Sequence, residues 1–196
     1  MIHCCRRIVL LLMGFTTAAV ATSMSPGELI ELGVTRLTKQ MLTERAMLAL
    51  DTEKLYALVD QELGPHLAVR KIARLVVGRH WKKATQAQQE EFTVGFRRLL
   101  IKTYAASIFE HVSEAKIEFK PFSIKKHSRT AIVRTLIRFD DGSKVPIDYK
   151  LLLGSEGQWL IYDVLISRLS LVINFRNSYG RIVKSGGFDA LLELLR

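Results

Sequence analysis

Cysteine is almost absent from this 196-residue chain. The only two, Cys4 and Cys5, lie in an N-terminal segment that we expect to be removed on export. The mature chain would then contain no thiol, which excludes disulfides, cysteine nucleophiles and cysteine-ligated zinc. In an oxidising compartment the fold must therefore be stabilised by its core alone.

That N-terminal segment has the pattern of a secretory signal peptide. Arg6 and Arg7 precede an apolar run, and Ala19-Val20-Ala21 forms an A-x-A cleavage site. We expect residues 1–21 to be cleaved, leaving residues 22–196 as a single soluble domain in a bacterial periplasm. A retained membrane anchor is the alternative, but the run is short and rich in Thr and Ala for a spanning helix. No later segment is long and apolar enough to span a bilayer.

Catalytic motifs are also scarce. No two histidines beyond the signal peptide have a metal-ligand spacing such as H-x-x-x-H, and there is no P-loop and no dinucleotide fingerprint. Asp148 and Asp163 fall on neighbouring predicted strands and are the residues that could act as a base in an enzyme. In the competing interpretation the role is structural, with the carboxylate held by backbone amides or by an arginine of a neighbouring element such as Arg176, because an unpaired buried charge is costly. We therefore expect a protein that is not an enzyme, with no catalytic residue, no metal and no cofactor.

Acidic residues are few relative to basic ones. The chain has 29 Lys and Arg against 19 Asp and Glu, a formal charge of +10. Such a balance can indicate nucleic acid binding, but export argues against a nucleic acid partner. An anionic membrane surface, an acidic protein partner and simple solubility remain as interpretations. Two basic segments could form such a surface, Arg70/Lys71/Arg74 and Arg79/Lys82/Lys83.

The first half of the chain reads as helical. Ser25 and Glu28 have the spacing of a capping box, with Pro26 at the first helical position. Further helices are predicted over residues 51–63, 67–77 and 85–111. Apolar residues on the last and longest form one stripe, Phe92, Phe96, Leu99, Leu100, Tyr104 and Ile108.

In the second half the period of the apolar residues changes to two. Three half-buried strands are predicted in an antiparallel meander, with turns at 141–142 and 154–157. The following stretch, 159–175, reads WLIYDVLISRLSLVINF and carries apolar residues at both parities up to residue 166. We interpret it as a central strand with an apolar layer on each face. Helices return after it, with a break at 185–187. The expected fold class is α+β, with a helical part over 22–111 followed by about four antiparallel strands and returning helices over 115–196.

An exported chain rich in apolar surface and poor in catalytic groups is suited to carrying a hydrophobic ligand. A two-chain lipid exposes roughly 30 methylenes, so on the order of 20 kcal/mol opposes its passage through water. A curved sheet covered by helices, with its inner face not filled by its own side chains, could hold such a ligand.

Two sequence blocks resemble the MlaC, or toluene-tolerance, family of periplasmic proteins. The first contributes Gly78, Trp81, Ala84-Thr85, Gln88, Phe92, Phe96 and Thr103-Tyr104-Ala105. The second contributes Trp159, Tyr162-Asp163-Val164, Ser170-Leu171-Val172 and Asn174-Phe175-Arg176. One departure is Arg168-Leu169, where the family usually has Gly and a β-branched residue. We expect this change to affect the turn from strand to helix and to place a charge near the mouth of the pocket.

The resemblance implies a phospholipid carrier with an NTF2-like or cystatin-like curved sheet. Its implied partners are phospholipid, the MCE-domain subunit of an inner-membrane ABC transporter, and an outer-membrane lipoprotein complex, and its implied role is to maintain outer-membrane lipid asymmetry. We expect a monomer. Candidates for the acyl-chain pocket are Phe92, Phe96, Leu100, Tyr104, Tyr149, Tyr162, Val164, Leu171, Val172 and Phe175.

Three alternatives remain open from the sequence. The cargo could be a hopanoid or another hydrophobic ligand instead of a phospholipid. The protein could be a non-catalytic adaptor that bridges envelope proteins, in which case the core should be filled. It could also be an enzyme on a similar sheet, with Asp148 or Asp163 as base.

Overall fold

The two longest predicted helices begin at capping residues, as the sequence indicates. The computed structural model describes residues 24–196, and the predicted signal peptide over 1–21 lies outside the described residues. In α1 (Pro26–Thr43) the Ser25 hydroxyl accepts a hydrogen bond from the amide of Glu28, whose carboxylate accepts from the Ser25 amide. Thr85 and Gln88 repeat this reciprocal pair at the start of α5 (Gln86–His111). Each pair satisfies two backbone donors that a helix start leaves without partners.

Four further helices complete the helical part. They are α2 (Arg45–Leu50), α3 (Thr52–Leu63), α4 (Val69–Val77) and α6 (Leu171–Glu193), with 3-10 turns η1 (Gly64–His66) and η2 (Gly78–Lys83). The sequence did not indicate α2, which has no side-chain cap. The break predicted near the end of α6 is a kink at Gly187, where φ is 76°.

A five-stranded antiparallel sheet follows in the order β1-β2-β3-β4-β5. The strands are β1 (Lys116–Phe119), β2 (Thr130–Arg138), β3 (Lys144–Leu153), β4 (Trp159–Ile166) and β5 (Leu169–Ser170). The meander and both of its turns are confirmed. The strand absent from the prediction is β5, whose two residues are too short to leave a periodic signal.

The apolar run in β4 contains a β-bulge that the sequence did not predict. Asp163 pairs with Lys150 and Ile161 pairs with Leu151, so Tyr162 is an extra residue without a partner on β3. Such a β-bulge shifts the alternation of side chains by one position. Ile161 before the bulge and Val164 after it therefore line the same cavity despite their opposite parity. The bulge accounts for part of the apolar run, and an apolar layer on each face of this strand stays a prediction.

The turn between β4 and β5 keeps a tight geometry without glycine. Ser167 and Arg168 have φ of 50° and 68°, and Ile166 pairs directly with Leu169. Positive φ at both central residues is the signature of a type I′ hairpin turn, which favours Asn-Gly. Arg168 thus adopts the left-handed conformation that glycine adopts at no steric cost.

Replacing Arg168 with glycine is therefore expected to stabilise the fold. The left-handed conformation costs a non-glycine residue about 1–2 kcal/mol, and glycine's greater freedom in the unfolded chain cancels part of the gain. We expect the free energy of unfolding to rise by about 0.5 kcal/mol, as measured by urea denaturation. The same substitution at Arg181, inside α6, should lower it by about 1 kcal/mol. Destabilisation by both would contradict strain at Arg168.

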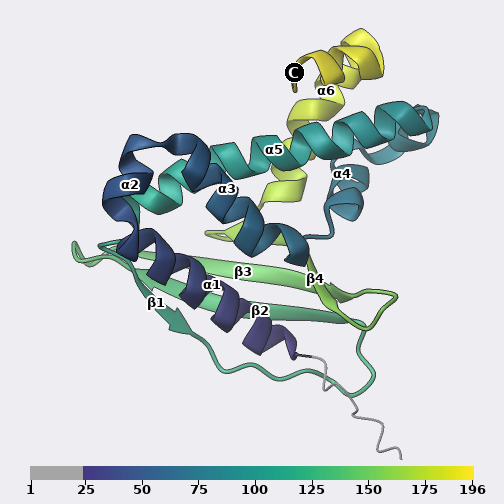
Figure 1. Ribbon diagram of the computed structural model, residues 1–196. Helices are drawn as coiled ribbons and strands as arrows, with labels where there is room; N and C mark the ends of the chain where they lie inside the picture. The colour runs from purple at the N-terminus through teal and green to yellow at the C-terminus, as the bar shows by residue number, and fades with distance from the viewer. Residues whose placement is uncertain (1–23) are drawn as a thin grey trace, which may run out of the picture.

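The helices cover one face of the sheet (Figure 1). Helix α1 crosses that face directly, and the long α5 lies beyond it with α3 between them (Figure 1). Buried residues form three clusters, one between α1 and the sheet, one among α1, α2, α3 and α5, and one among α4, α5 and α6. Within residues 24–196 no helix is both long and apolar enough to cross a membrane.

Candidate functional site

A cavity of about 440 Å³ lies between the sheet and the helices that cover it. Its walls come from α1, α3, α4 and α5, from the inner face of β1–β4, and from the first turns of α6. Almost all of the lining side chains are apolar. A volume in this range is typical of ligand pockets in proteins.

Eight of the ten predicted pocket residues line this cavity. They are Phe96, Leu100, Tyr104, Tyr149, Val164, Leu171, Val172 and Phe175. They come from α5, β3, β4 and α6, which the chain brings together around one space. That these residues contact a ligand stays a prediction.

The two others, Phe92 and Tyr162, do not line the cavity. Phe92 is fully buried among α4, α5 and α6, stacked on Phe96 at 5.4 Å between ring centroids. Tyr162, the bulged residue of β4, packs against the same helical cluster. The stripe on α5 is therefore divided, since Phe92 belongs to the core and the cavity wall begins at Phe96.

Phe92 and Phe96 form part of an aromatic cluster with α6. Tyr179 lies edge-on to both rings, at 6.1 Å and 5.9 Å. Burial raises the pKa of Tyr179 to about 12 because its ionised form would lie among apolar groups. Phe175 meets Phe96 edge-on at 5.1 Å and also lines the cavity. This cluster fixes α6 against α5 and so holds one wall in place.

Most of the cavity wall contributed by α1 and the sheet was not predicted from the sequence. The largest omitted group is the inner face of α1, Leu29, Ile30, Gly33, Val34, Leu37 and Thr38. The helical spacing of its apolar residues was visible in the sequence, but it gave no means of telling a cavity wall from a filled core. The inner faces of β2 and β3 add Ile137, Val145 and Ile147.

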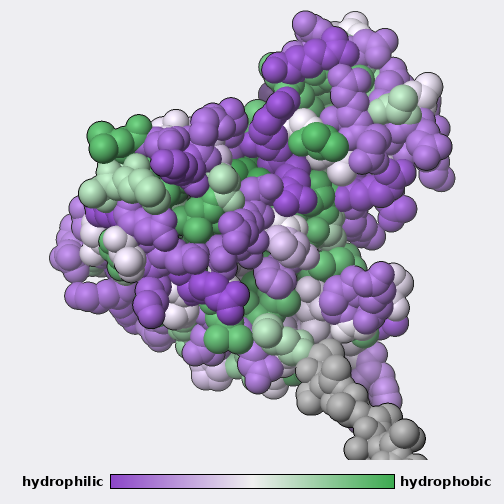
Figure 2. Space-filling model, in the orientation of Figure 1, coloured by the Kyte–Doolittle hydropathy of each residue, from purple (hydrophilic) through white to green (hydrophobic). Residues whose placement is uncertain are grey.

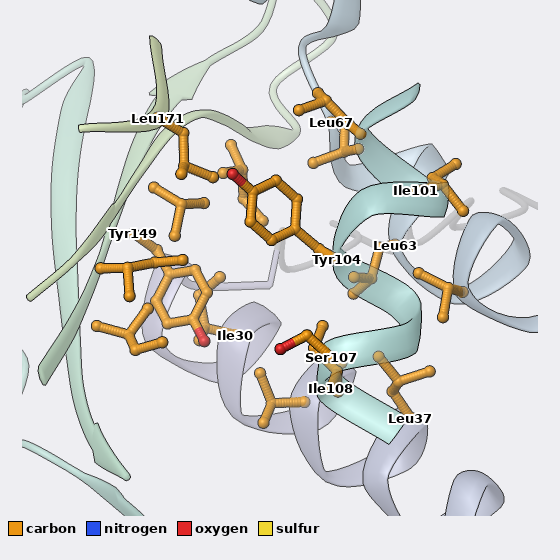
Figure 3. Close-up of a pocket in the computed structure, with 18 of the residues that line it drawn as sticks. Ile30, Leu37, Leu63, Leu67, Ile101, Tyr104, Ser107, Ile108, Tyr149 and Leu171 are labelled. Carbon is orange, nitrogen blue, oxygen red and sulfur yellow. The ribbon is translucent and has the colours of Figure 1, made fainter. Parts of the chain in front are cut away.

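Few polar groups reach the cavity. Tyr104 from α5 and Tyr149 from the sheet project from opposite walls into the same space, with Ser107 nearby (Figure 3). Burial raises the pKa of both tyrosines, so each remains a neutral hydroxyl at neutral pH and a possible hydrogen-bond partner for a ligand. Among residues 24–196 no three His, Asp, Glu or Cys side chains gather closely enough to hold a metal ion.

Asp163 is buried at the junction of β4 and α6, where it organises the start of the helix. Its carboxylate accepts hydrogen bonds from the Ser170 hydroxyl, at 2.8 Å and 3.0 Å, and from the amide of Val172 at 3.2 Å. The Lys150 ammonium lies 3.4 Å away. The predicted pairing with Arg176 was wrong, because the Arg176 guanidinium instead donates to the carbonyl of Leu75 at 2.6 Å. Asp163 thus has a structural role in capping α6, because it holds both the N-cap residue Ser170 and the amide of Val172.

The other candidate base is also engaged in a structural contact. Asp148 lies on β3 with the Arg134 guanidinium 3.8 Å from its carboxylate. The residues that line the cavity include Asp163 but not Asp148. This arrangement places the two carboxylates in different surroundings and does not join them as an acid–base pair.

A second, shallower hollow of about 380 Å³ lies outside the cavity, between α1 and β1. Val34, Thr38, Ala115 and Ile117 line both spaces. The two spaces therefore adjoin each other at these four side chains. The short strand β1 is an edge of the sheet, so no further strand among residues 24–196 closes this side of the cavity.

Comparison with known proteins agrees with this architecture. The solved structure of a phospholipid-binding protein from Ralstonia solanacearum, in complex with a phospholipid, superimposes with a TM-score of 0.77 and 27% identity. The match covers 85% of this chain and 92% of that one. The α+β class predicted from the sequence is thereby confirmed.

Sequence relatives point the same way. The toluene tolerance protein ttg2D of Pseudomonas putida is 21% identical over 190 residues, which cover 96% of this chain and 87% of that protein. The intermembrane phospholipid transport system binding protein MlaC of Haemophilus influenzae is 22% identical over 183 residues, 92% and 85% of the two chains. The family model described as MlaC protein matches residues 33–196. The chain therefore belongs to the MlaC family.

Proposed function

We propose that this chain is a periplasmic phospholipid carrier that takes up acyl chains in the cavity between its sheet and helices. The observation that carries the proposal is the cavity itself, which is about 440 Å³ in volume and lined almost wholly by apolar side chains. The similarity to a phospholipid-binding protein and to a binding protein of a phospholipid transport system supports the same cargo.

The physical need for such a host follows from the cost of exposing lipid to water. Each methylene removed from water contributes about 0.8 kcal/mol, so a chain that is only half sheltered still faces a large barrier. The cavity offers apolar contacts from opposite sides, with Val164 and Tyr149 on the sheet and Leu100 and Tyr104 on α5. The polar headgroup would remain at the partly exposed rim, where Ser107 and His111 lie.

A cavity also distinguishes the carrier from the adaptor. An adaptor that only bridges other proteins needs a filled core, and the space lined by Phe96, Leu171 and Val164 is not filled by this chain's own side chains. The enzyme alternative has no support in the carboxylates, because Asp163 caps a helix and Asp148 lies outside the cavity lining.

The partners of such a carrier would be the donors and acceptors of its lipid. We infer an inner-membrane ABC transporter with an MCE-domain subunit on one side and an outer-membrane lipoprotein complex on the other, with outer-membrane lipid asymmetry as the outcome. Export through the signal peptide would place the chain between them. Family membership supports these proposals, and the monomeric state stays a prediction.

Native mass spectrometry of the mature protein, purified from a periplasm without detergent, tests the proposal. We expect a stoichiometric adduct that extracts into organic solvent as a diacyl phospholipid. An extracted hopanoid would retain the carrier and change its cargo. A clean apo mass that persists after incubation with labelled phospholipid vesicles would contradict the carrier function.

A further inference from the structure

Acidic residues are missing from two long stretches of the sequence. Residues 63–89 contain six Lys and Arg and no Asp or Glu. Residues 164–188 contain four Lys and Arg and likewise no Asp or Glu. The first stretch spans α4 and η2, and the second contains most of α6. Over the whole chain the ratio is 29 basic to 19 acidic residues, so acidic residues are selectively depleted in these two segments.

The fold brings the two stretches together. Helix α4 packs along α6, and η2 also contacts α6; the two helices lie side by side in Figure 1. The Arg176 guanidinium on α6 donates to the carbonyl of Leu75 near the end of α4. Arg176 also lies near Gly78 at the start of η2, because its Nε atom is 3.9 Å from the position that a Cβ atom on Gly78 would occupy. Arg176 of the second stretch therefore lies against the segment that carries the cations of the first.

We call this surface the basic face and define it by six residues, Lys71, Arg74, Arg79, Lys82, Lys83 and Arg176. Across residues 24–196 no carboxylate lies within 4.0 Å of any of these six cations, although many other cations of the chain have one. Their positive charge is thus not neutralised within the chain, and all six are at least partly exposed. The lobe that includes α4 and the end of α6 is predominantly hydrophilic in Figure 2.

Two exposed apolar residues lie at the start of α6 and just before it, three and seven residues before Arg176 of this face. Leu169 is 73% exposed and Ile173 is 55% exposed. Between them in sequence, Leu171 and Val172 turn inward and line the cavity. The same short segment thus presents apolar side chains to solvent on one side and to the cavity on the other.

We propose that the basic face, together with Leu169 and Ile173, is the docking surface for a protein partner that presents a cluster of carboxylates. An apolar centre beside charged residues is the usual composition of a specific protein interface. Opposite charges would speed and orient the encounter. A link between docking and lipid transfer rests on the proposed function, because α4 and α6 both contribute cavity wall through Ile72, Leu171 and Val172.

A protein surface fits these features better than a bilayer. Residues 63–89 have no strongly exposed large apolar side chain, so within the docking surface only Leu169 and Ile173 could insert between lipids. Three of the six cations of the face are arginines, Arg74, Arg79 and Arg176. The planar guanidinium of arginine suits two-point contacts with carboxylates. Arg176 is already held in place by the Leu75 carbonyl, so less conformational freedom is lost when a partner binds.

Charge reversal with a matched control tests the docking surface. The face variant carries Arg74→Glu, Lys82→Glu and Lys83→Glu, and the control carries Lys125→Glu, Lys126→Glu and Lys144→Glu, which are exposed cations on the sheet side of the fold. Both variants change the net charge equally. Binding of the full mature chain to fluorescent poly-L-glutamate and to phosphatidylglycerol vesicles is measured from low to physiological salt. Bound lipid is measured in the same samples by native mass spectrometry.

We expect the face variant to bind poly-L-glutamate at least about tenfold more weakly and with a smaller salt dependence, and the control to lose about threefold or less. Leu169→Ser does not change the charge and should leave the binding of poly-L-glutamate, which has no apolar side chain, unchanged. Equal losses in the two charge variants would mean that only net charge matters and would overturn the proposal. Vesicle binding that depends on the face, without binding of poly-L-glutamate, would assign the face to a membrane instead. Lipid content is independent of these outcomes, so the absence of bound lipid from every variant would contradict the proposed function and not the docking surface.

Discussion

Replacing Val164 with aspartate is expected to abolish lipid loading while the chain stays folded. Val164 lies on β4 directly opposite Tyr149 of β3, and both side chains line the cavity. A carboxylate there would have to lose its hydration each time an acyl chain enters, which costs several kcal/mol. Since 1.4 kcal/mol corresponds to a factor of ten, the affinity for phospholipid should fall at least about 100-fold. The measurement is the lipid-bound fraction by native mass spectrometry after incubation with labelled vesicles.

The control for this variant is Ile132→Asp on the neighbouring strand β2. Ile132 is 42% exposed, whereas Val133 beside it is 2% exposed, so the new carboxylate would remain hydrated on the outer face of the sheet. We expect normal loading and a change in unfolding free energy of about 0.5 kcal/mol or less. Circular dichroism establishes that both variants are folded. Normal loading of folded Val164→Asp would show that this part of the cavity does not hold lipid.

Predictions from the sequence were correct where interactions within one helical turn or one strand determine the structure. The capping residues Ser25 and Thr85 marked the starts of two helices, because the hydrogen bonds that begin a helix are made within one turn. Alternation marked β2 and β3, because side chains of a strand point alternately to the two faces. The apolar residues of α5 were recognised as one stripe for the same reason, through their spacing along a single helix.

What the sequence could not supply was the register between distant segments. The bulge at Tyr162 depends on pairing with β3 and reverses the face on which all later residues of β4 lie. Phe92 and Phe96 are one turn apart and chemically identical, yet only Phe96 reaches the cavity, because the position of α6 decides where the core ends. The partner of Asp163 is Ser170, seven residues away across the β4–β5 turn, whereas the cost of an unpaired buried charge had pointed to Arg176.

Loss of the Asp163 carboxylate is expected to cause the largest decrease in stability among single substitutions in this region. Asp163→Ala would leave the Ser170 hydroxyl and the Val172 amide without their buried acceptor and the half-buried Lys150 ammonium without its counter-charge. Removing one partner from a buried charged pair costs about 3–5 kcal/mol. For a chain of this length we expect the midpoint of thermal unfolding to fall by about 10 °C, as measured by calorimetry.

Asp148→Ala provides the matched control, because it removes the same side chain from the adjacent strand. Asp148 meets Arg134 at 3.8 Å, and the Arg134 side chain is 60% exposed, so its loss should cost about 1 kcal/mol or less. Equal destabilisation by the two substitutions would contradict the capping role of Asp163.

The position of Asp163 also connects stability with lipid binding. Its carboxylate holds the first turn of α6, and that turn contributes Leu171 and Val172 to the cavity wall. If the cap keeps the wall in place, Asp163→Ala should release bound phospholipid at a temperature well below its own unfolding midpoint, whereas the unsubstituted chain should lose lipid only as it unfolds. Asp163→Asn keeps an oxygen acceptor and the same shape, so the temperature at which it releases lipid should lie between those of Asp163→Ala and the unsubstituted chain. Coincident lipid release and unfolding in all three proteins would mean that the cap stabilises the fold without controlling the cavity.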